Sequence, residues 1–116
     1  RASEQARRVR ETWGADFIHR TTGWHLTGGL PLQHISWLRE HRPDIFRAAQ
    51  RFLFVNDFII HRLTGELCMN PSDAGITQLF SIAAADWDEQ LLEIAGITRD
   101  QLAPLQPSGS VVALLR

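Results

Sequence analysis

The feature that most constrains the fold of this chain is the placement of glycine and proline between short amphipathic stretches. Glycine favours the left-handed conformation that ends a helix, and proline fits a first helical turn but not a helix interior. These residues stand at the borders of successive helical patterns: Gly14, Gly23, Pro31, Pro43, Gly65, Pro71 and Gly96. The pattern therefore predicts a series of short helices, each stopped by its own sequence.

The stretches between these residues repeat their apolar positions at helical spacing. In the first stretch, Ala6, Val9 and Trp13 share one face, and Ser3 stands at the N-cap position. Similar patterns predict helices over 3–14, 15–23, 31–43, 44–50, 57–65, 70–75 and 86–96. The apolar segments 51–54 and 111–115 instead favour short strands. The expected fold class is mainly α with one or two short strands, without a domain boundary inside residues 1–116.

Two helix starts and one apolar face carry more specific expectations. Asn56 is the expected N-cap of helix 57–65, with Val55 as a candidate for the hydrophobic staple. Asp86 and Glu89 have the spacing of a capping box at the start of the last helix. Four apolar residues around helix 57–65 fall on one face: Val55, Phe58, Ile59 and Leu63.

Charge and composition exclude several classes of protein. The formal net charge is −1, whereas a general nucleic-acid or membrane-surface binder usually carries a basic excess. No apolar run approaches the length that spans a bilayer. Cys68 is the only cysteine and cannot form an internal disulfide, which fits a reducing cytoplasm. We therefore expect a cytoplasmic protein with neither nucleic acid nor membrane among its partners.

The arginines near the start of the chain allow two interpretations. Arg1, Arg7, Arg8 and Arg10 crowd the first helical stretch. They can form a solvated face that pairs with neighbouring glutamates, Glu4 and Glu11. They can also form an anion-binding or inter-domain surface.

The chain lacks the parts that usually hold a nucleotide or a metal ion. It contains no lysine, no tyrosine and no glycine-rich phosphate-binding motif, so we expect this chain to bind no cofactor. Its five histidines show no spacing typical of a metal site. Cys68 has only His61 within a few turns and nothing to orient it as a base, so a nucleophilic cysteine is not expected.

The segment "NPSDAG" explains an isolated acidic residue without catalysis. Asn70 is a favoured N-cap, Pro71 fits the first helical position, and Asp73 then falls at the third. There its carboxylate can accept a hydrogen bond from the cap N–H and meets the positive end of the helix dipole. We therefore predict a structural role for Asp73 and no catalytic residue in this chain.

The loop "GWHLTGGLP" also has two interpretations. Its glycine pair would let the backbone approach a ligand closely, and Trp24 could offer an apolar wall to a sugar ring. Alternatively, the loop only connects two helices around a buried tryptophan.

The order of these segments resembles the FGGY family of carbohydrate kinases, which includes xylulokinase, glycerol kinase and the autoinducer-2 kinases. The resemblance covers about ninety residues, through "TTGWHLTGGLPLQHISWLREHRPDIF" and "RFLFVNDFIIHRLTGELCMNPSDAGITQLFSIAAADWDEQLLEIAGITRDQLAPL". Two positions depart from the family pattern: Asn70 stands where an acidic residue is frequent, and Phe58 where tyrosine is frequent. Both still suit a cap and a packing position.

The resemblance implies an α/β, RNase H-like N-terminal lobe in a two-lobed, actin-like ATPase fold, with this chain as the helical second half of that lobe. It implies an ATP- and Mg²⁺-dependent kinase for a small sugar or polyol, with the general base, the phosphate loop and most of the ATP site outside the chain. The remainder of the kinase chain is then a partner, and a homodimer is compatible.

Within this chain the resemblance implies one substrate-adjacent stretch: Thr27, Gly28, Gly29 and Leu30. The chain begins at Arg1 without a methionine, so we interpret it as an inactive excerpt of the kinase. The alternative is a non-enzymatic helical module that binds proteins through its arginines and tryptophans.

Overall fold

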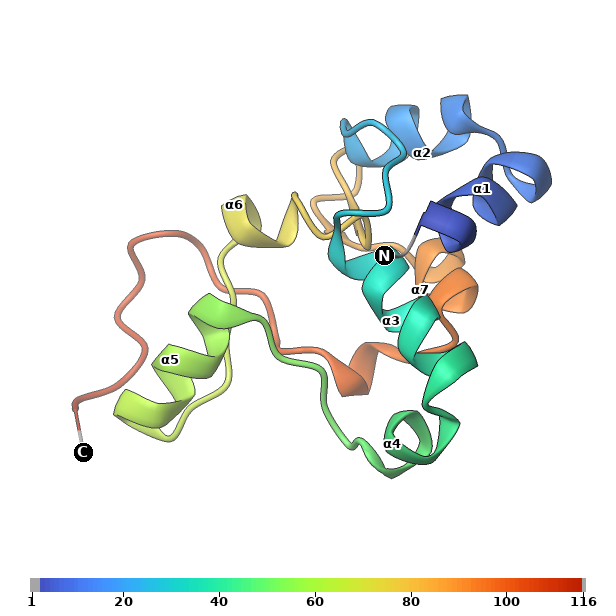
Figure 1. Ribbon diagram of the computed structural model, residues 1–116. Helices are drawn as coiled ribbons and strands as arrows, with labels where there is room; N and C mark the ends of the chain where they lie inside the picture. The colour runs from blue at the N-terminus through green and yellow to red at the C-terminus, as the bar shows by residue number, and fades with distance from the viewer. Residues whose placement is uncertain (1–2, 116) are drawn as a thin grey trace.

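The computed structural model describes residues 3–115, and helices dominate them (Figure 1). The α-helices are α1 (Ser3–Thr12), α2 (Ala15–Thr22), α3 (Pro31–His41), α4 (Pro43–Ala48), α5 (Val55–Thr64), α6 (Pro71–Ala74) and α7 (Glu89–Ala95). The remaining elements are β1 (Phe80–Ser81), β2 (Asp86–Trp87) and a 3-10 helix at Arg99–Gln101. The expected fold class, mainly α with one or two short strands, is confirmed.

Glycine and proline end and begin the helices as expected. Pro31, Pro43 and Pro71 each open a helix. Three helices end in a left-handed glycine, at Gly23, Gly65 and Gly96. The positive φ of Gly96 is what requires glycine there, since the nearest side chain, Arg39, is exposed and can shift. The local sequence therefore determines where these elements stop.

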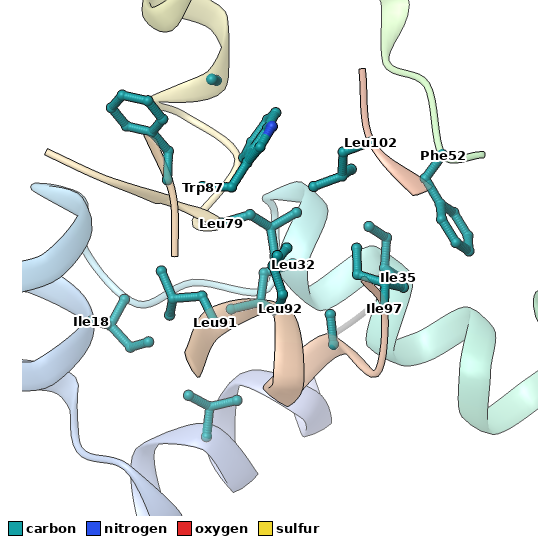
Figure 2. Packing of buried hydrophobic residues seen from close by; sticks show 14 of the residues in the cluster. Ile18, Leu32, Ile35, Phe52, Leu79, Trp87, Leu91, Leu92, Ile97 and Leu102 are labelled. Carbon is teal, nitrogen blue, oxygen red and sulfur yellow. The ribbon is translucent and has the colours of Figure 1, made fainter. Parts of the chain in front are cut away.

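The core lies around α3, which packs against α1, α4 and α7. Leu32 and Ile35 of α3 are buried, as the helical spacing predicts, and Leu38 is half-buried. Figure 2 shows how side chains from separate segments meet there: Ile18, Phe52, Leu79, Trp87, Leu91, Leu92, Ile97 and Leu102. Core burial therefore depends on contacts between segments that are far apart in the sequence.

The strands form one antiparallel hairpin, and not where the sequence places them. Phe80 pairs with Trp87 and Ser81 with Asp86, and the rings of Phe80 and Trp87 meet edge to face at 6.3 Å. The expected strand at 51–54 is wrong: the backbone there makes a hydrogen bond from Phe52 N–H to the Gln101 carbonyl, 2.7 Å, but no ladder. Residues 111–115 likewise form no strand within the described range. Apolar composition alone cannot supply a partner strand.

The capping expectations need two corrections. α5 begins at Val55, two residues earlier than predicted, because the Asp57 carboxylate accepts a hydrogen bond from the Phe54 N–H, 2.7 Å. Asn56 is therefore inside the helix and does not cap it. In the last helix Asp88 is the N-cap, whereas Asp86 pairs with Arg99 at 2.7 Å.

Helix α5 presents its apolar side to solvent. Figure 1 shows α5 and the C-terminal segment projecting from the group formed by α1, α3 and α7. In α5, all of which is described, Asp57 is the only buried residue. Val55 is 78% exposed and Leu63 is 51% exposed, and Phe58 and Ile59 lie beside them. We call these four residues the apolar face of α5. None of the helices in residues 3–115 has the length and apolar character needed to cross a membrane.

We expect the apolar face of α5 to make the isolated chain self-associate, since exposed apolar patches drive association. Leu63→Glu should lower light scattering and the fluorescence of an apolar dye, because a charge on this face opposes its burial. The control is Gln90→Glu, which adds the same charge at an exposed position of α7. Equal scattering by both variants would show that another surface is responsible.

Candidate functional site

The predicted substrate-adjacent stretch is the tip of the loop between α2 and α3. Thr27 and Gly29 are exposed, and Gly28 and Leu30 are half-buried. The Thr27 hydroxyl accepts a hydrogen bond from the Gly29 N–H, 3.3 Å, which closes the tip on itself. The carbonyl of Leu30, the N-cap residue of α3, accepts from the N–H of Gln33, 3.0 Å. The structure therefore brings the predicted site residues together in one exposed turn.

Three hydrogen bonds hold the base of this loop to the segment 77–82. The N–H of Ile82 donates to the Thr21 carbonyl, 3.0 Å, at the end of α2. The Gln78 side chain donates to the His25 carbonyl, 2.7 Å, within the loop. The Leu32 N–H donates to the Thr77 carbonyl, 2.9 Å, at the start of α3. The exposed tip is therefore carried on a base that is fixed on both sides, as a binding loop requires.

The two glycines at the tip are not required by the backbone conformation. Neither Gly28 nor Gly29 has a positive φ. A Cβ at Gly29 would lie 3.8 Å from the Thr27 hydroxyl oxygen, an ordinary contact. What glycine contributes here is the absence of a side chain, so no side chain covers the backbone at these two positions.

Trp24 does not fill the core, so the alternative of a connection around a buried tryptophan is wrong in that respect. Trp24 is 44% exposed, and its backbone N–H donates to the Thr22 hydroxyl, 3.1 Å. A cavity of about 360 Å³ is lined by residues of α1, α2 and this loop, which include Arg10, Asp16 and His25. An exposed indole remains available as an apolar wall.

Asp73 lies where the helix-start interpretation places it, with one difference. Its N–H donates to the Asn70 side-chain oxygen, 2.8 Å, which confirms Asn70 as the N-cap. Its carboxylate accepts from the side-chain amide of Asn70, 3.0 Å, and not from the cap N–H as expected. The same oxygen accepts from the Asn56 amide of α5. Asp73 therefore joins α6 to α5, which the local sequence did not indicate.

Around this junction the structure buries groups without full hydrogen bonding. Asp57 is completely buried, and its second carboxylate oxygen has no partner among residues 3–115. Burial raises the pKa of Asp57, backbone N–H groups oppose that shift, and the nearby Asp73 carboxylate adds to it. Burial also raises the pKa of the Cys68 thiol. A buried thiol with a raised pKa is a poor nucleophile, in agreement with the prediction from sequence.

Two arginines of α1, Arg7 and Arg8, are paired within the fold, whereas Arg10 is exposed. Arg7 pairs with Glu4 at 2.6 Å and with Glu11 at 3.7 Å. Arg8 makes two hydrogen bonds to Glu40 of α3, 2.5 and 2.9 Å. Arg1 lies outside the described residues. This pairing supports the interpretation of a solvated face, with the addition that Arg8 also ties α1 to α3.

The described residues do not form a site for a metal ion or a nucleotide. No group of three histidine, cysteine or acidic side chains suited to a metal occurs among residues 3–115. The chain also has no lysine and no glycine-rich phosphate loop. Mg²⁺ and ATP therefore have no fitting donor set here.

Comparison with known proteins agrees with this arrangement. The model of the FGGY family of carbohydrate kinases, N-terminal domain, matches residues 1–116. The autoinducer-2 kinase of Photorhabdus laumondii is 32% identical over an alignment of 116 positions. This alignment covers 97% of this chain and 22% of that protein. The gluconate kinase of Lactobacillus acidophilus superposes with a TM-score of 0.93 at 26% identity, over 99% of this chain and 23% of that one. The ligand-bound xylulose kinase of the same organism superposes with a TM-score of 0.92 at 26% identity, over 99% of this chain and 24% of that one.

These likenesses place the chain in the class of sugar kinases with the actin-like ATPase fold. The chain belongs to the FGGY family of carbohydrate kinases and matches its N-terminal domain. It spans about a fifth of the length of the curated relatives that it matches.

Sequence reasoning missed the residues that support the loop tip. Gln33, Thr77 and Gln78 are all buried, yet nothing in their local sequence distinguishes them from ordinary polar residues. Their function in the fold arises from hydrogen bonds to segments far away in the chain, and only the folded arrangement reveals it.

The buried carboxyl of Asp57 should make stability depend on pH. A carboxyl with a raised pKa in the folded chain binds its proton more tightly there than in the unfolded chain. Its contribution therefore favours folding at low pH and is lost as the pH rises from the ordinary value of 3.8 through the raised pKa. Asp57→Asn keeps an acceptor for the Phe54 N–H and removes the charge, so its free energy of unfolding should fall less as the pH rises above about 4.

Urea denaturation at several pH values measures this difference. Asp16→Asn, which removes an exposed carboxylate from α2, is the control and should follow the original chain. Parallel curves for the Asp57 variant and the original chain would contradict the assignment.

Proposed function

We propose that the protein containing this chain is an ATP- and Mg²⁺-dependent cytoplasmic kinase that phosphorylates a hydroxyl of a small sugar or polyol. The observation that carries the proposal is the match of the FGGY N-terminal domain to every residue of the chain. The 32% identity to an autoinducer-2 kinase supports the same class of reaction. Catalysis of this kind consists mainly of positioning the two substrates and stabilising charge on the transferred phosphoryl group.

In this proposal the chain supplies part of the sugar-pocket wall and the helical packing behind it. The tip Thr27–Leu30 is exposed while its base is fixed at both sides, which suits a surface that contacts a small ligand. The remainder of the kinase chain supplies the nucleotide site and the general base. A protein-binding helical module has less support, because Arg7 and Arg8 are already paired within the fold.

The names of the relatives define which substrates to test. They act on autoinducer-2, gluconate, xylulose and glycerol, all small compounds rich in oxygen. The full-length kinase should be assayed with Mg-ATP against each of these, with ADP release coupled to a spectroscopic signal. Phosphorylation of at least one supports the proposal, and ADP release that never depends on an added acceptor overturns it.

The 116-residue chain on its own should bind no Mg-ATP and phosphorylate nothing, since its described residues lack a phosphate cradle. Calorimetry with Mg-ATP and the same coupled assay measure this. Turnover by the isolated chain would contradict the proposal that the chemistry lies in the rest of the kinase.

Asp73→Asn in the full-length kinase should separate capping from catalysis. The loss of charge at the junction of α5 and α6 should cost about 1 kcal/mol of stability. Turnover at saturating sugar and ATP should stay within a few-fold of the unchanged enzyme, whereas loss of a general base typically costs about 100-fold to 10,000-fold. A hundredfold loss of turnover with an unchanged melting curve would place Asp73 in the active site.

A further inference from the structure

Gln78 adopts a backbone conformation that residues other than glycine rarely adopt. Its φ is +63°, and its side chain is completely buried. A left-handed residue with a Cβ costs free energy and persists only where its surroundings hold it there. Hydrogen bonds of the neighbouring Thr77 hold Gln78 in this conformation. The Thr77 hydroxyl accepts from the Leu79 N–H at 3.0 Å and donates to the Ala74 carbonyl at 2.7 Å.

The Gln78 side chain bridges the two sides of the loop tip. Its amide nitrogen donates to the carbonyl of His25, 2.7 Å, which lies two residues before Thr27. Its amide oxygen accepts from the side chain of Gln33, 3.2 Å, which lies in the first turn of α3 just after Leu30. A glutamine amide offers a donor and an acceptor at one end of a side chain, so a single residue reaches both sides.

This bridge has no substitute within the described chain. Gln33 is fully buried, and its own amide oxygen has no partner among residues 3–115. The hydrogen bond to Gln78 is therefore the one that orients the Gln33 side chain. Losing Gln78 leaves the amide of the buried Gln33 without its partner and removes the partly buried hydrogen bond to the His25 carbonyl, which favours movement of the loop.

We propose that Gln78 is a positioning residue for substrate, which sets the geometry of the tip Thr27–Leu30 through His25 and Gln33. The inference rests on the proposed kinase function and adds a residue that touches no substrate itself. A displacement of about 1 Å at a positioning group can cost about 100-fold in rate. Because the proposed function sets the tip at the sugar and not at the nucleotide, the effect falls on the KM for the sugar and leaves the KM for ATP unchanged.

The test uses the full-length kinase and whichever of autoinducer-2, xylulose, gluconate and glycerol it phosphorylates fastest. Gln78→Leu removes both hydrogen bonds at similar size. Gln78→Asn keeps an amide and suits the left-handed conformation, but its side chain is too short for the bridge. The matched control is Gln101→Leu, because the Gln101 side chain likewise bridges two groups, the Ala49 carbonyl at 3.4 Å and the Thr98 N–H at 3.0 Å, away from the loop.

We expect both Gln78 variants to raise the KM for the sugar about tenfold or more, with the KM for ATP within twofold. Gln101→Leu should leave both constants within twofold. Amide hydrogen exchange should also become faster in peptides covering 24–30 in the Gln78 variants, and not in the control.

The possible outcomes separate the role of Gln78 from the proposed kinase function. If the unchanged kinase phosphorylates a probe but Gln78→Leu and Gln101→Leu have equal KM values for it, Gln78 is only structural and this inference is wrong. A normal KM in Gln78→Asn also overturns it, because the backbone conformation and not the bridge would then matter. Absence of phosphorylation with all four probes overturns the proposed function, and this inference with it.

Discussion

The hydrogen bond from the Leu32 N–H to the Thr77 carbonyl, 2.9 Å, connects the first turn of the central helix to the segment that leads into the hairpin. Around α3, the helices α1 and α7 bury apolar residues, and α4 packs Phe46 partly against the same core. The hairpin that follows places Phe80 and Trp87 against the same core. Because one short segment bonds to the end of α2, to the loop and to the start of α3, the position of the loop follows from the packing of the core.

A second junction is polar, and it explains the different behaviour of α5. Asp57 is the buried residue of that helix, and Asn56 reaches the carboxylate of Asp73 at the start of α6. Hydrogen bonds therefore hold α5 in place, while its apolar side stays in solvent. Burying a carboxylate costs free energy unless hydrogen bonds compensate, and here one carboxylate oxygen of Asp57 remains without a partner. Within the described residues, the apolar face of α5 stays uncovered.

Under the proposed function, this chain supports the sugar pocket and the chemistry lies in the rest of the kinase. The chain has no phosphate loop and no lysine, and its isolated acidic residue Asp73 serves a helix junction. Under that proposal, the turn around Gly28 and Gly29, on its fixed base, is what the chain presents to a ligand. Binding elements of this kind act through precise placement, so residues behind the tip can matter as much as those on it.

The sequence by itself determined the helical class and most helix borders, because the conformational limits of glycine and proline act locally, at Gly23, Pro31 and Gly65 for example. It also led to the family and to Asn70 as a cap, since that contact spans only three residues. Only the tertiary structure decided that 51–54 forms no strand, that Asp88 caps α7 while Asp86 pairs with Arg99, and that Gln78 lies beneath the loop. These features depend on which distant segments meet, and the free energy of such contacts comes from shared burial that no short stretch of sequence contains.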